Sequence, residues 1–441
     1  MALSGSLALA LLFSLLSCYA SVPSLASSDG FIQCLSAAIP RQLLYTQSSP
    51  SFTSVLVSSI RNPKFSTPGT VRLLCIVTPT NASHVQAAVV CGRRNDVRIR
   101  VRSGGHDYEG LSYRSARPEV FAVVDLANLR SVRVDQKAAT AWVDSGATLG
   151  GLYYAVSKAS SQLAFPAGLC PTIGVGGHFS GGGFGMLLRK YGVAIDNVLD
   201  ATLVDANGRI LDKQAMGADV FWAIRGGGGE SFGIVLSWQA ANFESMYLGT
   251  PDTLLPLMRS RFPELGLNRT HCKEMTWIQS VPYIYLGSAA TVEDILNRTT
   301  ATKSFSKATS TSVRPSPRTC GPPESATPFP HRGGVLYNIQ YMNFWSAATD
   351  GSAQTRWLKD LYAFMGPYVS KNPREAYANY RDLDLGQNVV VGNVTSYEAG
   401  KVWGEKYYKG NFQRLATAKS KVDPDDYFRN EQSIPPLPAT K

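Results

Sequence analysis

Hydrophobic and polar positions follow two different periods along the first half of the chain. A helical period runs through residues 82–93 and 149–160. A period of two predicts strands over residues 97–103, 121–126 and 140–147. This mixture predicts an α+β fold without the strict strand–helix–strand repeat of a Rossmann unit.

Two further segments extend the pattern. Residues 198–212 read as two strands joined at Asn207-Gly208, a dipeptide typical of hairpin turns. Residues 219–238 read as a helix, a glycine-rich loop and a strand. No glycine run matches G-x-G-x-x-G, which argues against a nicotinamide-dependent enzyme.

The composition changes in the second half of the chain. Helices are expected at residues 250–262, 291–297 and 355–369, and a strand is expected at 333–345. Residues 304–328 are rich in serine, threonine and proline, which predicts a loop or a disordered segment. We detect no internal repeat.

Two glycine-rich loops carry the candidate chemistry. His106 lies in RSGGHDYEG (102–110), and Cys170 lies in FPAGLCPTIGVGGHFSGGGFG (165–185). Glycine lets backbone N–H groups turn toward a ligand and approach it closely. The two loops therefore suggest a phosphate-bearing cofactor with one nucleophile near each end of its reactive ring. Each loop alone is equally consistent with a core histidine or a buried thiol beside glycine turns.

The N-terminus and four sequons indicate secretion. Residues 6–17 form a short apolar run followed by small residues, which predicts a signal peptide cut after Ala20 or Ala26. The run is too short for a spanning helix, and no later segment could span a bilayer. We therefore expect an extracellular or cell-wall protein, with the vacuole as the alternative. Four glycosylation sequons agree with secretion, at Asn81, Asn268, Asn297 and Asn393.

The net charge of +11 has three interpretations, which are nucleic acid binding, attachment to an anionic polymer, and solubility alone. Secretion and the lack of a recognition motif argue against nucleic acid. Loose attachment to an anionic cell-wall polymer fits better. The 441 residues suffice for two or three domains and a large core, and we expect a monomer.

Long motifs carry a resemblance to a known family. Besides the two glycine-rich loops, they are FWAIRGGGGESFGIV (221–235), NYRDLDLG (379–386) and YFRNEQSIPP (427–436). Together they resemble the berberine bridge enzyme-like family of plant FAD-linked oxidases. The resemblance runs from about residue 34 to 238 and again from about residue 329 to 436, and it implies a secreted FAD-dependent oxidoreductase.

The resemblance implies a two-part FAD-binding domain of the vanillyl-alcohol-oxidase/p-cresol methylhydroxylase type, plus a smaller antiparallel-sheet substrate domain with helices. Relative to the family, elements are missing after Trp238 and at 304–328, so we expect an incomplete substrate sheet with exposed edges. The expected segments are a signal peptide (1–26), the FAD-binding domain (27–240), the substrate domain (241–374) and a C-terminal segment that returns to the FAD-binding domain (375–441).

The resemblance also implies which residues hold the cofactor. His106 would bond the flavin 8α-methyl group and Cys170 would bond flavin C6, giving a bicovalent FAD. His178 would face the flavin N1/O2 edge, where a hydrogen bond or a positive charge favours the anionic reduced ring. A zinc site of His178 with Cys170 lacks further ligands at suitable spacing. The other cofactor-binding residues would be Arg102, Ser103, Gly104, Gly105, Gly174, Gly176, Gly177, Gly181, Gly182, Gly233 and Ile234.

The family's catalytic positions fall on Tyr380, favoured as the base, and on Tyr108 and Gln340, which would position the substrate. A tyrosine needs a cation or hydrogen bonds to lower its pKa before it can act as a base. Two departures weaken this activation, because Asn338 replaces a common lysine and Phe184 replaces a common tyrosine. Gln340 stands where alkaloid-cyclising members have a glutamate, which argues against reticuline-type chemistry.

The expected reaction is hydride transfer to flavin N5 from a C–OH carbon. The substrate would be a carbohydrate hemiacetal, free or in an oligosaccharide, or an aromatic, monolignol-type alcohol. Ile173 takes the family position that gates oxygen, and its bulk predicts a dehydrogenase with low oxygen reactivity. The alternative is a catalytically inactive FAD-binding remnant or a faulty gene model.

Cysteine use adds one expectation. If Cys170 holds flavin and the signal peptide is removed, an odd number of cysteines remains, so at least one is unpaired or pairs elsewhere. Cys34 with Cys91 is our choice for a disulfide, and the resemblance supports it. Such a bridge would be worth about 4 kcal/mol in the chain-entropy model.

Overall fold

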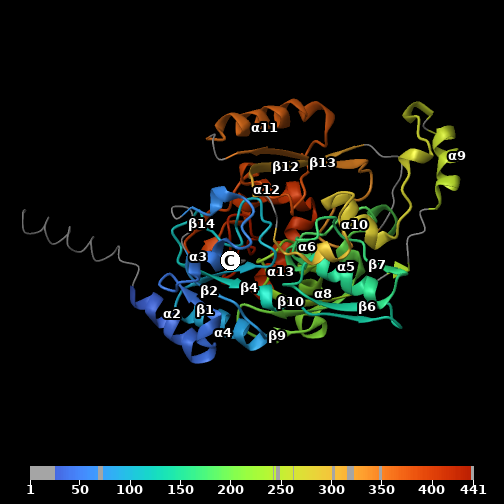
Figure 1. Ribbon diagram of the computed structural model, residues 1–441. Helices are drawn as coiled ribbons and strands as arrows, with labels where there is room; N and C mark the ends of the chain where they lie inside the picture. Colours follow the sequence, from blue (N-terminus) through green and yellow to red (C-terminus); the bar gives the residue numbers. More distant parts are fainter. Residues whose placement is uncertain are drawn as a thin grey trace, which may run out of the picture.

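The computed structural model describes residues 25–438 except 68–72, 242, 245–248, 262, 300–302, 315–321 and 347–349. The expected signal peptide lies almost wholly outside the described residues, which begin with helix α2 (Leu25–Ala38). None of the described helices is long and apolar enough to cross a membrane. Figure 1 shows a large lobe, which contains two extended sheets, and a small lobe above it with one strand pair and one helix.

The first sheet of the large lobe has four strands, in the order β1 (Leu44–Thr46), β2 (Leu73–Val77), β4 (Phe121–Asp125) and β3 (Arg98–Arg102). Strands β2, β4 and β3 run parallel, and β1 is antiparallel to β2. Helix α4 (Ala82–Arg94) packs against α2, and α3 (Phe52–Val57) contacts β2. A disulfide joins Cys34 of α2 to Cys91 of α4, which confirms the expected pairing.

The second sheet has five antiparallel strands, in the order β5 (Val132–Asp135), β6 (Thr140–Asp144), β10 (Ile234–Ala241), β8 (Val198–Val204) and β9 (Ile210–Leu211). The expected hairpin is confirmed: β8 turns into β9 through Gly208, whose φ of +76° favours glycine. Helix α5 (Leu149–Ala159) contacts β5, and α8 (Lys213–Ile224) contacts β8. Trp238 of β10 is fully buried and donates its Nε1–H to Ser145 Oγ over 3.1 Å.

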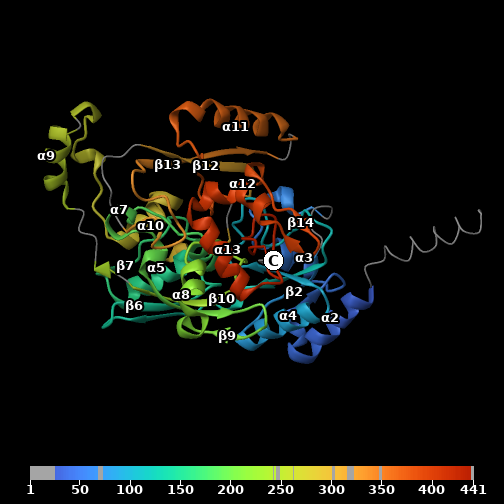
Figure 2. The same cartoon turned by 180° about the vertical axis from the view of Figure 1, so that it is seen from behind.

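The shorter elements fill the connections. Residues 291–297, expected as a helix, form only a 3-10 turn at Glu293–Leu296. Helix α9 lies at the periphery in both views (Figures 1 and 2). The elements are α6 (Val175–Ser180), α7 (Leu188–Tyr191), α9 (Pro251–Arg261), α10 (Trp277–Leu286), the strand pair β7 (Leu163–Ala164) with β11 (Phe243–Glu244), and the strand pair β14 (Val390–Val391) with β15 (Val394–Thr395).

The small lobe is an antiparallel pair of strands, β12 (Phe305–Val313) and β13 (Tyr337–Trp345), covered by helix α11 (Ser352–Phe364) (Figure 1). Tyr341 of β13 packs against Tyr362 of α11, with ring centroids 5.9 Å apart. Within the described part of the chain no third strand joins this pair. A two-stranded unit is marginally stable by itself, so the small lobe depends on its contacts with the large one.

The expectation of a loop or disordered segment over residues 304–328 is wrong for its N-terminal part, which is strand β12. Thr311 is buried, and its hydroxyl lies 3.0 Å from the hydroxyl of Tyr341. Ser310 is buried too, and its Oγ accepts the backbone N–H of Tyr377 over 2.9 Å. Hydroxyl side chains that find partners can be buried, and β-branched threonine favours strands. A composition typical of disorder therefore concealed a strand.

One buried ion-pair cluster fastens the small lobe to the large lobe. Lys307 of β12 places its Nζ 2.6 Å from Glu109 Oε1 and 2.5 Å from Asp382 Oδ1. Burial opposes the ammonium charge, but the two carboxylates outweigh burial and raise the pKa of Lys307. Asn62 adds a hydrogen bond from Nδ2 to the carbonyl oxygen of Ser306, 2.9 Å long.

The C-terminal segment folds back into the large lobe. Helices α12 (Tyr397–Tyr408) and α13 (Asn411–Val422), which the sequence pattern did not reveal, pack on each other, and α13 contacts α8 (Figure 2). Phe428 is fully buried in the same apolar cluster as Val85 of α4. Arg100 of β3 pairs with Glu431 at 3.3 Å, and each of these side chains is 1% exposed. The large lobe is therefore completed by residues that follow the small lobe in sequence.

Candidate functional site

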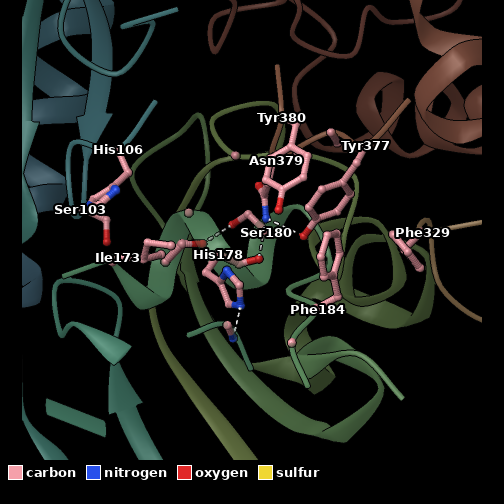
Figure 3. A pocket seen from close by; sticks show the side chains of 18 of the residues that line it. Ser103, His106, Ile173, His178, Ser180, Phe184, Phe329, Tyr377, Asn379 and Tyr380 are labelled. Carbon is pink, nitrogen blue, oxygen red and sulfur yellow. Dashed lines mark hydrogen bonds between the residues drawn. The ribbon is translucent and has the colours of Figure 1, made fainter. Parts of the chain in front are cut away.

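A cavity of about 1100 Å³ is lined by residues of both lobes. Its walls come from the two glycine-rich loops, the start of β10, strand β13 and residues 377–381. Figure 3 shows His106 on one side of this cavity, Tyr377 and Tyr380 on the other, and His178 between them. The cavity therefore brings together segments that lie hundreds of residues apart in sequence.

The two candidate nucleophiles meet at a single threonine. His106 Nε2 lies 2.9 Å from Thr172 Oγ1, and Cys170 Sγ lies 3.4 Å from the same oxygen. Burial, with a smaller contribution from the charge of Arg61, lowers the pKa of His106 to about 3. The imidazole is therefore neutral, as a nitrogen nucleophile must be.

The glycines beside these residues are required by close backbone contact. A Cβ on Gly104 would lie 2.3 Å from the backbone nitrogen of Gly174, so the two loops touch main chain to main chain. Gly105 has a φ of +67°, a conformation that side chains rarely permit. A Cβ on Gly177 of α6 would meet nothing within 4 Å, so this helix presents open space to the cavity. Such a wall, with two nucleophiles at its edge, fits the ring system and pyrophosphate of FAD.

His178 is held as a neutral ring. Its Nε2 accepts the backbone N–H of Gly168 over 3.0 Å, so its proton resides on Nδ1. Burial lowers the pKa of His178 to about 4. Asn379 donates Nδ2–H to the carbonyl oxygen of His178 over 2.9 Å, which ties this helix to the C-terminal segment (Figure 3). We expected His178 to offer the flavin either a hydrogen bond or a positive charge. A neutral ring can offer only the hydrogen bond.

An aromatic cluster forms the opposite wall. The ring of Tyr380 lies 5.0 Å from Tyr377, 5.7 Å from Phe184 and 5.9 Å from Tyr108, measured between centroids. Gln340 of β13 donates Nε2–H to the hydroxyl of Tyr108 over 2.7 Å. Burial raises the pKa of Tyr108 to about 12. Burial, and to a smaller extent the neighbouring tyrosines, also raises the pKa of Tyr380. Tyr380 is therefore protonated at neutral pH.

Most of the residues singled out in the sequence line this cavity, but three do not. Arg102 is buried behind the first loop, where it donates to Asp125 Oδ2 over 2.6 Å. A Cβ on Gly181 would contact the side chain of Asn379, and one on Gly182 would contact Phe329. The lining residues among those singled out are Ser103, Gly104, Gly105, His106, Tyr108, Cys170, Ile173, Gly174, Gly176, Gly177, His178, Gly233, Ile234, Gln340 and Tyr380.

Sequence reasoning missed two residues of the site. Thr172, between the two nucleophiles, is marked only by its place two positions after Cys170. Glu230 lines the cavity, has a φ of +65° and accepts the backbone N–H of Val101 over 2.9 Å. Burial raises the pKa of Glu230 to about 7. A charged residue inside a run of glycines was the available signal for Glu230.

Features outside the cavity bear on the other sequence expectations. No group of histidine, cysteine or acidic residues that could hold a metal ion occurs within the described residues. Cys75 is buried and unpaired, and burial raises the pKa of its thiol to about 12. Cys272 is also a free thiol, whereas Cys320 lies outside the described residues. The four sequon asparagines, Asn81, Asn268, Asn297 and Asn393, are all exposed.

Comparisons with known proteins agree with this geometry. Residues 73–213 match the family described as FAD binding domain, and residues 376–435 match the family described as Berberine and berberine like. Berberine bridge enzyme-like Cyn d 4 of Cynodon dactylon is 56% identical, over 92% of this chain and 93% of its own length. That alignment spans 484 positions, more than the 441 residues of this chain, so the relative contains internal segments that this chain lacks.

Two solved structures are similar over almost the whole chain. One is Phl p 4, a grass pollen allergen with glucose dehydrogenase activity, with a TM-score of 0.90 and 54% identity over 92% of this chain and 99% of that one. The other is an isoleucine-to-valine variant of Phl p 4, described as a glucose oxidase, with a TM-score of 0.90 and 53% identity over 92% of this chain and 99% of that one. With this agreement in sequence, fold and cavity, the chain belongs to the berberine bridge enzyme-like family of FAD-linked oxidoreductases.

Proposed function

We propose that this protein is a secreted, glycosylated oxidoreductase that carries FAD on both His106 and Cys170 and oxidises the C–OH group of a carbohydrate hemiacetal. The carrying observation is that both side chains lie within hydrogen-bonding distance of Thr172, at the edge of a cavity that also holds Tyr380. When bound, FAD supplies the hydride acceptor, and the residues around it bind and orient the alcohol.

The relatives support a sugar as the substrate. Phl p 4 has glucose dehydrogenase activity and shares more than half of its sequence with this chain. The cavity is large enough to admit a sugar beside the cofactor. Aromatic, monolignol-type alcohols are the second candidate, because the wall formed by Tyr108, Phe184, Tyr377 and Tyr380 offers flat apolar faces.

Tyr380 receives the substrate proton in this proposal, and Tyr108 with Gln340 positions the sugar hydroxyls. Because burial keeps Tyr380 protonated at neutral pH, proton acceptance needs high pH or concerted release of the tyrosine's own proton. Gln340, fixed on Tyr108, cannot accept a proton, which agrees with simple alcohol oxidation.

The cellular setting is part of the proposal. The exposed sequons and the N-terminal apolar run support secretion to the extracellular space or cell wall, and the net charge of +11 supports loose attachment to anionic polymers. The protein would act as a monomer.

Absorbance of the purified protein tests the proposal. A yellow protein whose flavin band bleaches under nitrogen with glucose or a glucose oligosaccharide supports it. Bleaching only with coniferyl alcohol would move the substrate to the aromatic class. A yellow protein inert to both would identify an FAD-binding remnant without activity.

A further inference from the structure

Thr172 marks the place where the two nucleophiles meet, but the proposed function gives it no role of its own. It lies between Cys170 and the start of α6, and its side chain is buried, with 5% exposure. Its hydroxyl oxygen is 2.9 Å from His106 Nε2 and 3.4 Å from Cys170 Sγ. Thr172 therefore makes hydrogen-bonding contacts with both nucleophiles.

The contact with Thr172 bears on which nitrogen of His106 is the nucleophile. The 2.9 Å contact joins Nε2, and not Nδ1, to the threonine hydroxyl. In a neutral ring one nitrogen carries the proton and the other carries a lone pair. When Nε2–H donates to Thr172 Oγ1, the lone pair is on Nδ1.

The hydroxyl of Thr172 also contacts the sulfur of Cys170. If Nε2–H of His106 points at Thr172 Oγ1, the hydroxyl hydrogen of Thr172 is free to point at Cys170 Sγ. Tyr285 of α10 also lines the cavity, and after burial its interaction with Cys170 contributes to the raised pKa of the Tyr285 phenol. A hydroxyl this close can donate a hydrogen bond to the sulfur and hold it beside His106.

We propose that Thr172 is the positioning residue that makes attachment of the cofactor at two points possible, with Tyr285 as its partner at the sulfur. This inference rests on the proposed bicovalent attachment and adds the residue that organises it. Thr172 orients Nδ1 of His106 toward the flavin methyl carbon, and it delivers a hydrogen bond to the sulfur of Cys170.

In the histidine step a C–N bond would form at Nδ1 while a C–H bond of the methyl group breaks. The methyl proton would pass to solvent, the Nε2 proton would leave through the hydroxyl of Thr172 to solvent, and the two electrons would pass through the flavin to dioxygen, for which a slow single turnover suffices. In the sulfur step a C–S bond would form at ring carbon C6, the thiol proton and the C6 hydrogen would leave as protons to solvent, and two further electrons would pass to dioxygen.

The test compares full-length holoenzymes of Thr172→Val, Thr172→Ser and the unmodified protein. Valine keeps the shape and removes the hydroxyl, whereas serine keeps the hydroxyl. The readouts are flavin retained in an acid-precipitated pellet and the mass of flavin-bearing peptides that contain residue 106 or 170. We expect Thr172→Val to lower the fraction of flavin-linked Cys170 at least tenfold and to slow linkage at His106, while Thr172→Ser resembles the unmodified protein.

Thr309→Val is the matched control. Thr309 is a buried threonine on β12 whose hydroxyl has no hydrogen-bond partner in the described residues, so its loss should leave both linkages unchanged. Tyr285→Phe should lower linkage at Cys170 alone. If Thr172→Val does not fold, Thr172→Ala compared with Thr172→Ser poses the same question.

The outcomes separate the inference from the function on which it rests. Unmodified protein without linked flavin overturns bicovalent attachment itself. Unmodified protein with both links, together with a Thr172→Val variant that has the same links at the same rate, overturns only the role of Thr172. Equal losses in Thr172→Val and Thr309→Val also overturn it, because they would reflect general disturbance of the fold.

Discussion

The two walls of the cavity are held in place by different interactions. The wall with His106 and Cys170 is bound by main-chain hydrogen bonds between segments, such as Leu149 N–H to the Ile173 carbonyl at 2.9 Å and Val175 N–H to the Ala147 carbonyl at 2.8 Å. Strand β13, which lines another side of the cavity, belongs to the small lobe, and the small lobe is joined to the large lobe by side chains, chiefly the ion pairs of Lys307 on β12.

Because of this difference, the side of the cavity that carries the cofactor residues is held firmly, whereas the small-lobe side can vary. Main-chain hydrogen bonds are independent of side-chain identity and do not titrate, so the bonds that join these segments of the cofactor wall do not depend on charged side chains. A wall attached by a few charged side chains can move or change sequence without disturbing the cofactor. Substitutions in the small lobe should therefore alter stability and substrate preference, whereas substitutions in the loops should alter cofactor attachment.

The largest expected effect concerns covalent attachment of the flavin to the cofactor wall. The double substitution His106→Ala and Cys170→Ala should release all flavin into the supernatant on denaturing precipitation, because no covalent link remains. Each single substitution should retain flavin through the other bond. Flavin fluorescence of pellet and supernatant measures this, and free flavin from the unmodified protein would contradict bicovalent attachment.

Loss of the tyrosine on the opposite wall should slow the chemistry by a large factor. Tyr380→Phe removes the proton acceptor and should lower kcat/KM for the alcohol about 10²- to 10⁴-fold, the usual contribution of general base catalysis. Because burial raises the pKa of Tyr380, kcat/KM of the unmodified enzyme should still rise with pH beyond about 10, the ordinary pKa of tyrosine. A plateau near neutral pH would assign the base elsewhere.

Breaking the joint between the lobes should reduce stability. Lys307→Met leaves Asp382 buried without this cation and leaves Glu109 with only Arg114, 3.6 Å away, so it should lower the free energy of unfolding by about 3–5 kcal/mol. Lys359→Met is the control, since its partner Asp384 is 3.2 Å away at an exposed site and the pair is worth about 0–1 kcal/mol. Chemical denaturation compares the variants, and equal losses would show that the cluster does not fasten the small lobe.

His178 should make the stability of the cofactor wall pH-dependent in acid. Its folded-state pKa of about 4 lies below the ordinary value of 6.5, so the unfolded chain binds a proton first as pH falls. The contribution is fully present above about pH 6.5 and is lost progressively toward pH 4, by about 3 kcal/mol. His178→Asn should flatten this part of the curve in thermal unfolding at several pH values, and an unchanged slope would contradict it.

The smallest expected effect concerns oxygen. Ile173 lines the cavity three residues after Cys170, and Ile173→Val removes one methylene from a close-packed wall. Reoxidation of the reduced flavin by air should then accelerate severalfold. Stopped-flow mixing with oxygenated buffer measures the rate. Fast reoxidation of the unmodified protein would contradict the role of Ile173 in limiting access of oxygen.

Sequence patterns predicted elements well where periodicity and turn chemistry agreed. The strands around Gly208 and the helix that contains Cys91 follow from local rules. Strand β12 did not, because burial of Thr311 and Ser310 depends on partners from Tyr341 and Tyr377 that only tertiary structure supplies. The same holds for Thr172, whose contact with His106 joins residues 66 positions apart. Motifs pointed to the candidate nucleophiles His106 and Cys170, whereas Thr172, which contacts both, became visible only in the fold.

The return of the C-terminus sets an order for biosynthesis. Phe428 fills the same core as Val85 and Val89, and Glu431 neutralises the buried Arg100. During translation, the first sheet therefore emerges long before the side chains that close it, and the domain stays open while the small lobe is made. A ribosome must finish the last codons before this protein has a site that can enclose its flavin, so a truncated product lacking residues 423–434 would be recognised by quality control as unfolded.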